Sequence, residues 1–259
     1  MILTVDIGNT NIVIGAWKED KLRFVARLQT EREKTADGFA IEIRSVLTLN
    51  DALPSQVEGA VLSSVVPQIT FQIEEALQKL TGSRPIVVGP GVKTGLNILI
   101  DNPAQLGSDM VSDAVGALAK YPLPAIIVDM GTATKIMALD KSGSFLGCAI
   151  MPGIRIGLDA LAERTASLPQ IGLEPPRDVI GKNTDDSMKS GSLYGTASMI
   201  DGMTARFERQ LGEHATVVAT GGFSGGIVPF CQRSVIIDPN LTLEGLYRVY
   251  QKNNKDAPY

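Results

Sequence analysis

The feature that most constrains this chain is a repeated pattern, in which an apolar run ends in an aspartate that a glycine turn follows. Residues 3–11 read LTVDIGNTN, and residues 126–134 read IIVDMGTAT. Each apolar run is typical of a buried strand, and a second strand after each turn completes a predicted β-hairpin. Two halves that open in the same way indicate an internal duplication, with a cleft between the halves.

Strands alternate with helices in both halves, which predicts an α/β fold. We place the domain boundary after residue 117, so that the predicted domains are 1–117 and 118–259, and we expect the last residues, 253–259, to be frayed. The expected strands lie near 2–7, 12–17, 22–28, 59–66, 85–89, 125–130, 135–139, 145–150, 216–222 and 234–238, and the expected helices near 35–48, 68–81, 109–119, 154–164 and 183–211, with a last helix from Leu243.

Composition excludes several classes of protein. With 259 residues, 44% of them hydrophobic, the chain can bury a large core, whereas a net charge of -4 argues against a surface that neutralises nucleic-acid phosphates. Apolar runs are too short and too often interrupted to span a membrane, and no secretory signal opens the sequence. We expect Cys148 and Cys231 to be reduced core residues of a cytosolic protein, and His214, the single histidine, to lie at the surface.

The two aspartates of the repeat, Asp6 and Asp129, are expected at corresponding strand ends that face each other across the cleft. Gly8 and Gly131 would let a nucleotide approach the backbone closely. Two carboxylates beside phosphates would repel them, so the arrangement predicts cations. The alternative is that both aspartates only cap their turns. Neutral donors for phosphate oxygens stand in the same turns: Asn9, Thr10, Thr132 and Thr134.

A third glycine turn, TGG at 220–222, follows another apolar strand and precedes a short helix. Its glycines could let a flat base lie against the backbone. The Walker sequence is missing, because GKNT at 181–184 lacks the upstream glycine and the adjacent hydroxyl residue. Any nucleotide site would therefore be built differently from that of a P-loop protein.

Asp109 stands at the expected start of a helix and is a candidate general base. It would be ionised at neutral pH and could accept a proton from a hydroxyl that attacks a phosphoryl group. The alternative is a structural one, in which Ser108 or Asp109 caps the helix.

The order of these motifs resembles that of type III pantothenate kinases, which belong to the superfamily of acetate and sugar kinases, heat-shock protein 70 and actin. The resemblance implies a duplicated ribonuclease H-like, actin-like ATPase fold and ATP-dependent phosphorylation of pantothenate, the first step towards coenzyme A, in a homodimer with the site near the dimer interface. It is carried by DIGNTN, GVKTGLNILIDNPAQLGSD, VDMGTAT, GCAIMPGI, TASLP, IGKNTDDSMKSGSLYG, ATGGFS and LTLEGL, in family order.

The resemblance also implies roles for individual residues. Asp109 would be the proton acceptor, and Asp129 would bind a monovalent cation, potassium or ammonium, beside magnesium and ATP. ATP would be contacted by Asp6, Ile7, Gly8, Asn9, Thr10, Asn11, Ile12, Val13 and Thr132, with Gly221 and Gly222 near adenine. Pantothenate would be contacted by Ile100, Gly107, Ser108, Asp109, Met110 and Thr184.

Two residues depart from the family pattern. The family usually has arginine where Met110 stands and commonly threonine where Lys135 stands. The loss of the arginine leaves open a kinase for another small hydroxyl-bearing substrate, or a catalytically weak regulatory relative that binds nucleotide. Lys135 could place an ammonium near the phosphates and make an added monovalent cation dispensable, or it could point from its strand into solvent.

Overall fold

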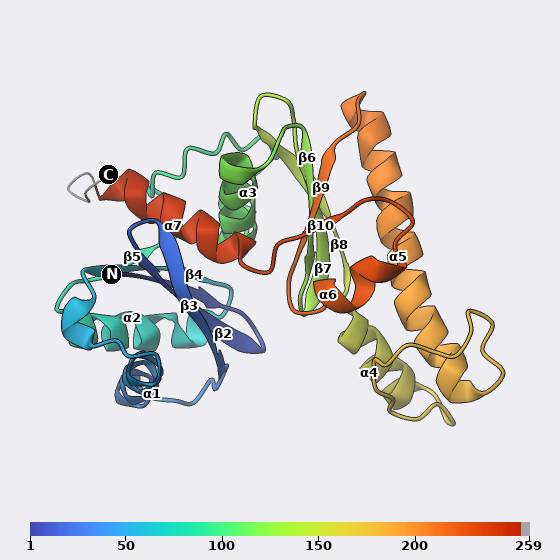
Figure 1. Cartoon of the computed structure of the whole chain (residues 1–259), viewed down its shortest axis with the longest axis horizontal. Helices are drawn as coiled ribbons and strands as arrows, with labels where there is room; N and C mark the ends of the chain where they lie inside the picture. Colours follow the sequence, from blue (N-terminus) through green and yellow to red (C-terminus); the bar gives the residue numbers. More distant parts are fainter. Residues whose placement is uncertain (255–259) are drawn as a thin grey trace. The chain divides into compact units, whose positions relative to one another are not determined.

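The computed structural model describes residues 1–254, which form two compact units (Figure 1). Unit 1 comprises Met1–Leu96, Asp101–Ala119 and the residues from Leu241 onward, and unit 2 comprises Asn97–Ile100 and Lys120–Asn240. Of the tail expected to be frayed, Asn253 is the last residue of a helix, and residues 255–259 lie outside the described part of the chain.

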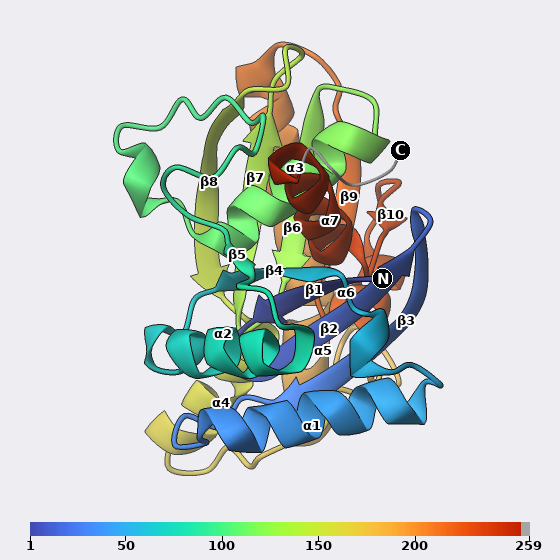
Figure 2. The ribbon, with the colours of Figure 1, turned by 90° about the vertical axis from the view of Figure 1, so that its left-hand side faces the viewer.

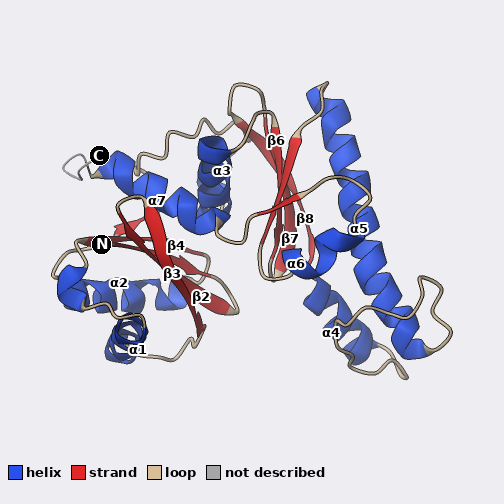
Figure 3. Ribbon diagram, viewed as in Figure 1, coloured by secondary structure: helices blue, strands red, loops and turns tan. Residues whose placement is uncertain are grey.

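Unit 1 contains a five-stranded sheet in the order β3-β2-β1-β4-β5. β1 pairs antiparallel with β2, which pairs antiparallel with β3, while β4 is parallel to β1 and β5 is parallel to β4. Figure 3 shows β2, β3 and β4 of this sheet as red strands. The predicted opening hairpin is confirmed. The strands are β1 (Ile2–Ile7), β2 (Asn11–Lys18), β3 (Lys21–Gln29), β4 (Gly59–Ser64) and β5 (Ile86–Val87).

Two helices cover one face of this sheet, α1 (Ala36–Leu49) and α2 (Pro67–Thr81), and α7 (Leu241–Asn253) packs on the other, as Figure 2 shows. α3 (Ser108–Lys120) packs closely on α7. Apolar side chains of β1 and β2 that point towards α1 and α2 form the core with them. Short 3-10 turns lie at Pro54–Gln56 and Pro103–Gln105.

Unit 2 repeats the sheet of unit 1. Its order is β10-β9-β6-β7-β8, with an antiparallel β6-β7-β8 meander and with β9 and β10 added in parallel. β6 takes the place of β1 and β9 the place of β4, so the internal duplication inferred from the sequence is confirmed. The strands are β6 (Ala125–Met130), β7 (Ala133–Leu139), β8 (Phe145–Pro152), β9 (Thr216–Thr220) and β10 (Ile236–Ile237).

Three helices belong to unit 2: α4 (Ile154–Arg164), α5 (Thr184–Leu211) and α6 (Ser224–Ile227), the last followed by a 3-10 turn at Val228–Phe230. α5 begins where Asn183 accepts the N–H of Asp186 at 2.8 Å, and it ends at Gly212, whose φ is 79°. Side chains of α5 pack on Val128 and Met130 of β6.

The compact units differ from a division after residue 117 in three places, of which the smallest is that unit 1 continues to Ala119. α7 begins at Leu241, two residues before the expected position, and packs on β1 and β4 of unit 1 although it follows β10 in the chain. Gly59 allows this approach, because a Cβ there would overlap the hydroxyl of Tyr250. Asn97 joins unit 2 by accepting the N–H of Phe145 at 2.8 Å.

The exposure of two side chains, His214 and Cys148, can be compared with what the sequence predicted. The side chain of His214 is fully exposed, as expected. Cys148, expected in the core, is exposed on β8, because side chains on that outer strand alternate between covered and open positions. Within residues 1–254, no helix is both long and apolar enough to cross a membrane.

Candidate active site

The first predicted phosphate turn joins β1 to β2 in unit 1. It is closed by a hydrogen bond from the Gly8 N–H to the Asn11 carbonyl at 3.0 Å, and the Thr30 hydroxyl donates to the Gly8 carbonyl at 2.7 Å. Asn9, Thr10 and Asn11 are exposed at its tip. The turn thus presents backbone and neutral polar side chains in a fixed conformation, which suits contact with phosphate oxygens.

The three apolar residues that flank this turn are less exposed than its tip. The side chains of Ile7 and Ile12 are in the core of unit 1, and Val13 is half-buried. Ile7 and Ile12 therefore support the turn from below, and only their backbone could meet a nucleotide. The sequence assigned them to the ATP site because they belong to the motif, whereas their burial follows from the alternation of side chains along β1 and β2.

Asp6 is the last polar residue of β1 and points away from the core that α1 and α2 cover. Its neighbour in the parallel ladder is Ser63 of β4, whose hydroxyl donates to Asp6 Oδ1 at 2.6 Å. Ser63 is fully buried and Asp6 is half-buried. This hydrogen bond fixes the direction of the Asp6 carboxylate at the carboxyl end of the strand.

The start of α3 is attached to the residue after Ser63. The Ser108 hydroxyl accepts the N–H of Ser64 and donates to the carbonyl of Ser64, both at 2.9 Å. The next residue, Asp109, accepts the N–H of Met110 at 2.7 Å. A first-turn carboxylate is favoured by the helix dipole. The Met110 contact joins adjacent residues, whereas an N-cap side chain accepts from the N–H two or three residues further on.

Gly107 and Met110 complete this part of the site. A Cβ on Gly107 would lie 2.6 Å from Asp109 Oδ1, so any side chain there would displace the carboxylate. The Met110 side chain is 8% exposed and therefore presents no polar group to solvent.

Ser63 and Ser64 were not among the residues that the sequence singled out. Together they bring Asp6 and the start of α3, with Asp109, to the carboxyl ends of β1 and β4 in unit 1. In α/β sheets ligands bind outside these strand ends. Two hydroxyl residues at the end of the apolar run GAVLSS were the available signal.

In unit 2 the second predicted phosphate turn joins β6 to β7. The Gly131 N–H donates to the Ala133 carbonyl at 3.1 Å, and the Gly153 N–H donates to the Thr132 carbonyl at 3.1 Å. Thr132 is exposed, whereas the Thr134 side chain is buried. Thr132 is therefore the hydroxyl of this turn that a ligand could reach.

Asp129, the residue predicted to bind a cation, lies beside this turn and forms an ion pair. Lys135 Nζ lies 2.7 Å from Asp129 Oδ2, and the two side chains are 13% and 14% exposed, respectively. Of the two alternatives for Lys135, the one in which it points from its strand into solvent is therefore wrong. In residues 1–254, no group of three or more histidine, cysteine, aspartate or glutamate side chains is arranged to hold a metal ion.

Gly221 lies directly against Asp129. Its φ is +87°, and a Cβ on it would lie 2.5 Å from the Met130 carbonyl and 2.7 Å from Asp129 Oδ1. Gly222, the next residue, is exposed and has open space around it. The third glycine turn therefore meets the end of β6, which the sequence could not show.

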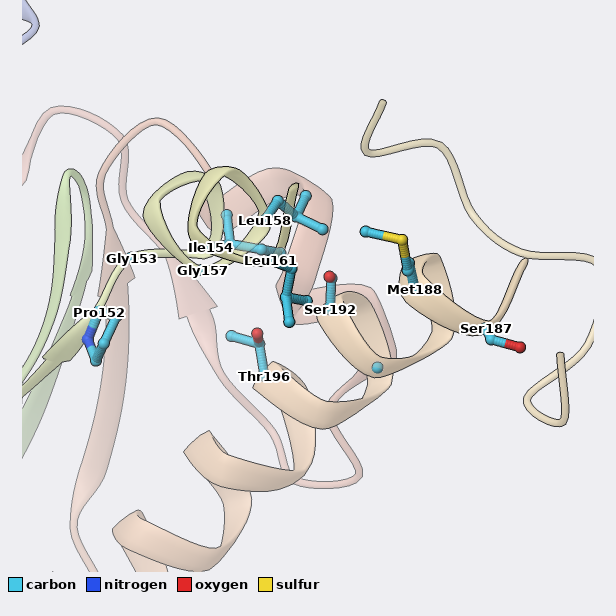
Figure 4. Close-up of a pocket in the computed structure, with 11 residues that line it drawn as sticks. Pro152, Gly153, Ile154, Gly157, Leu158, Leu161, Ser187, Met188, Ser192 and Thr196 are labelled. Atoms are coloured by element: carbon cyan, nitrogen blue, oxygen red, sulfur yellow. The ribbon is translucent and has the colours of Figure 1, made fainter. Parts of the chain in front are cut away.

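The two remaining predicted residues belong to unit 2. Ile100 is half-buried, and Thr184 is the exposed first residue of α5. A pocket of about 510 Å³ lies between α4 and α5, and Ser187, three residues after Thr184, is on its edge (Figure 4). At the other end of the pocket is Gly153, which contacts the β6–β7 turn.

Comparison with known proteins identifies the family to which the chain is similar. The sequence profile of a family described as type III pantothenate kinase matches residues 2–206. A type III pantothenate kinase of Exiguobacterium sp. is 46% identical over 255 residues, which are 98% of this chain and 100% of the relative. One from Moorella thermoacetica is 42% identical over 253 residues, with the same shares covered.

Solved structures share the fold at low sequence identity. The activator of 2-hydroxyisocaproyl-CoA dehydratase from Clostridium difficile, with bound ADPNP, is 12% identical with a TM-score of 0.56, covering 100% of this chain and 99% of its own. The (R)-2-hydroxyglutaryl-CoA dehydratase component A from Acidaminococcus fermentans is 13% identical with a TM-score of 0.56, covering 96% of each chain. With the two matching sheets, these likenesses confirm the duplicated actin-like ATPase fold.

Proposed function

Because the chain belongs to the type III pantothenate kinase family, we propose that it transfers the γ-phosphoryl group of ATP to pantothenate and so forms 4'-phosphopantothenate. This reaction is the first step towards coenzyme A. The observation that carries the proposal is the pair Ser63 and Ser64, which hold Asp6 and the start of α3 at neighbouring strand ends.

In the proposed reaction Asp109 accepts the proton of the pantothenate hydroxyl as its oxygen attacks the γ-phosphorus. The bond from phosphorus to the bridging oxygen breaks, and ADP leaves with that electron pair. Proton transfer of this kind contributes about 10²–10⁴-fold, and positioning supplies most of the rest in phosphoryl transfer. Gly107 and Ser108 serve by keeping Asp109 at the start of α3.

ATP contacts are proposed at both hairpin turns. The exposed tip Asn9–Asn11 and the Thr132 hydroxyl would meet phosphate oxygens, and Gly222 would lie near adenine, with Gly221 shaping that turn. The residues proposed to contact pantothenate are Ile100, Gly107, Ser108, Asp109, Met110 and Thr184.

Magnesium fits the donors that are present. Kinases bind this ion chiefly through substrate phosphates, water and one or two carboxylates, so a dedicated cluster of acidic side chains is not needed. Asp6, held by Ser63, is the carboxylate of unit 1 that could assist. Magnesium supplies charge neutralisation on the phosphates.

The proposal extends to the assembly and the compartment. We propose a homodimer in the cytosol, where Cys148 and Cys231, which form no disulfide, would stay reduced. Sedimentation of the purified chain measures its mass in solution, and a monomer at every concentration would contradict the dimer.

The test is ADP release from ATP and magnesium, with and without pantothenate, by the unaltered chain and by Asp109→Asn. We expect pantothenate-dependent release, which Asp109→Asn lowers about 10²–10⁴-fold while the Kd for ATP stays within about twofold. Asp51→Asn, in an exposed turn after α1, is the matched control and should behave as the unaltered chain. Release without pantothenate dependence, or full activity in Asp109→Asn, would contradict the proposal.

Met110 favours one alternative, a kinase whose acceptor lacks pantothenate's carboxylate. An apolar, buried side chain follows the proposed base where the family usually carries a cation. Met110→Arg separates the two functions, with Met110→Leu as the control for packing. A higher kcat/KM for pantothenate in Met110→Arg supports pantothenate as the acceptor, and no gain, in a folded variant, favours another hydroxyl-bearing substrate.

A further inference from the structure

The strand register places Lys135 directly opposite Asp129. β6 and β7 pair antiparallel, with Asp129 facing Lys135 and Met130 facing Thr134 next to the turn. Residues opposite each other in such a ladder project their side chains from the same face of the sheet. The hydrogen bond from Gly131 to Ala133 closes the turn, so the backbones of Asp129 and Lys135 are held opposite each other.

The ion pair lies away from the core of unit 2 and is nevertheless covered. Val128, Met130 and Ile136 alternate with the pair and point into the core that includes α5. On the opposite face, Lys135 and Asp129 are 13% and 14% exposed, and their charged atoms are 2.7 Å apart. Salt screens charges that are covered in this way much less than it screens surface charges.

A lysine in the next turn, between β7 and β8, forms an ordinary surface ion pair for comparison. Lys141, in the turn after β7, is 79% exposed and lies 3.7 Å from Glu213. Surface pairs of this kind contribute little to stability. The short, covered contact of Lys135 is different in kind, and Gly221 gives it space, because a Cβ on Gly221 would overlap Asp129.

A carboxylate beside a phosphate-binding turn needs a positive charge, because Asp129 would otherwise repel the phosphates that Thr132 is proposed to contact. A dissolved cation is one source of that charge. At this carboxylate, however, it would stand next to the Lys135 ammonium and be repelled by it. A monovalent cation at Asp129, expected from the resemblance, therefore does not fit the residues that are present.

We propose that Lys135 supplies this charge from within the chain, and that the protein consequently binds ATP and turns over without potassium or ammonium. The inference rests on the proposed function, since it concerns the same phosphates. Lys135 is accordingly a positioning residue, which holds Asp129 neutralised at the end of β6.

The experiment varies the cation and the lysine together. ATP affinity is measured by calorimetry, and pantothenate-dependent ADP release by a coupled assay, in tetramethylammonium chloride and in potassium chloride at equal ionic strength. The variants are Lys135→Met, which keeps the length of the stem but not the charge, and Lys135→Thr. Lys141→Met, in the turn between β7 and β8, is the matched control, and circular dichroism checks the folding of each variant.

We expect the unaltered chain and Lys141→Met to differ by less than about twofold between the two salts. Lys135→Met and Lys135→Thr should lose about 10²-fold in kcat/KM without potassium, with weaker ATP binding, and should recover most of it when potassium or ammonium is added. Rescue by a specific cation is a readout that the loss of a merely structural ion pair would not give.

Two results would overturn the inference: an unaltered chain stimulated about tenfold or more by potassium, or Lys135 variants that keep full ATP affinity in tetramethylammonium. If the variants fail to fold, the potassium titration of the unaltered chain still tests whether the protein needs an added monovalent cation. If no ADP forms with pantothenate in either salt, the proposed function fails, whereas the calorimetry still decides the role of Lys135.

Discussion

The Ser108 hydroxyl and the backbone of Ser64 form a reciprocal pair of hydrogen bonds, in which one oxygen accepts from the N–H and donates to the carbonyl, both at 2.9 Å. A strand end and a helix start are thereby joined at two points. This contact fixes where Asp109, the proposed base, stands relative to the end of β4.

Ser108→Ala is expected to remove both hydrogen bonds. It leaves the Ser64 N–H and carbonyl without this partner, which costs about 1–3 kcal/mol of unfolding free energy. Because Asp109 would then be held less well, kcat should fall while the KM for ATP stays nearly unchanged. Chemical denaturation and steady-state kinetics measure the two effects.

The matched control is Ser45→Ala, whose hydroxyl bonds only to the Ile41 carbonyl on an exposed part of α1. It should change stability by less than about 0.5 kcal/mol. Equal kcat in Ser108→Ala and in the unaltered chain would show that the contact does not position the base.

Gly221→Ala should disrupt the end of β6. The added Cβ meets the Met130 carbonyl at 2.5 Å and Asp129 Oδ1 at 2.7 Å, and the φ of +87° is unfavourable for alanine. We expect a loss of about 2–4 kcal/mol and greatly weakened ATP binding, measured by thermal unfolding and calorimetry.

Gly222→Ala provides the comparison one residue away. No atom lies within 4 Å of a Cβ on Gly222, so stability should stay within about 0.5 kcal/mol. If both alanine variants were equally stable, the close approach of Gly221 to Asp129 would not be a constraint on the fold.

Asp238 should make stability depend on pH at the acidic end. Its side chain, 6% exposed, accepts from Lys120 Nζ and from the Tyr121 hydroxyl, both at 2.7 Å. Burial alone would raise the pKa of Asp238, but these two bonds and the Lys120 charge outweigh it and hold the pKa below its ordinary value. The stabilisation is therefore present above the unfolded pKa, about 3.9, and is lost as pH falls through the lower folded pKa.

Asp238→Asn is expected to lower the unfolding free energy by about 1–3 kcal/mol at pH 7, and the difference from the unaltered chain should shrink between about pH 5 and pH 2. Urea unfolding at a series of pH values measures it. Asp51→Asn, in the exposed turn after α1, is the control and should leave the curve unchanged. Parallel curves for Asp238→Asn and the unaltered chain would contradict this account.

Much of the fold could be predicted from local patterns. The strands of both hairpins, α4 and α5 follow from the periodicity of apolar residues and from caps such as Asn183, and these signals act within a few residues. The family expectation, which rested on ordered motifs, is confirmed as well. The roles of the individual site residues stay predictions until the variants are measured.

The sequence by itself therefore determined the duplicated α/β plan, the two aspartate turns and the family, because each depends on patterns within short stretches of consecutive residues. Only the tertiary structure decided that Ser64 holds Ser108, 44 residues away, that α7 packs on unit 1, and that Lys135 turns to Asp129 and not to solvent. These contacts depend on strand pairing and on which faces become covered. No local propensity encodes either one.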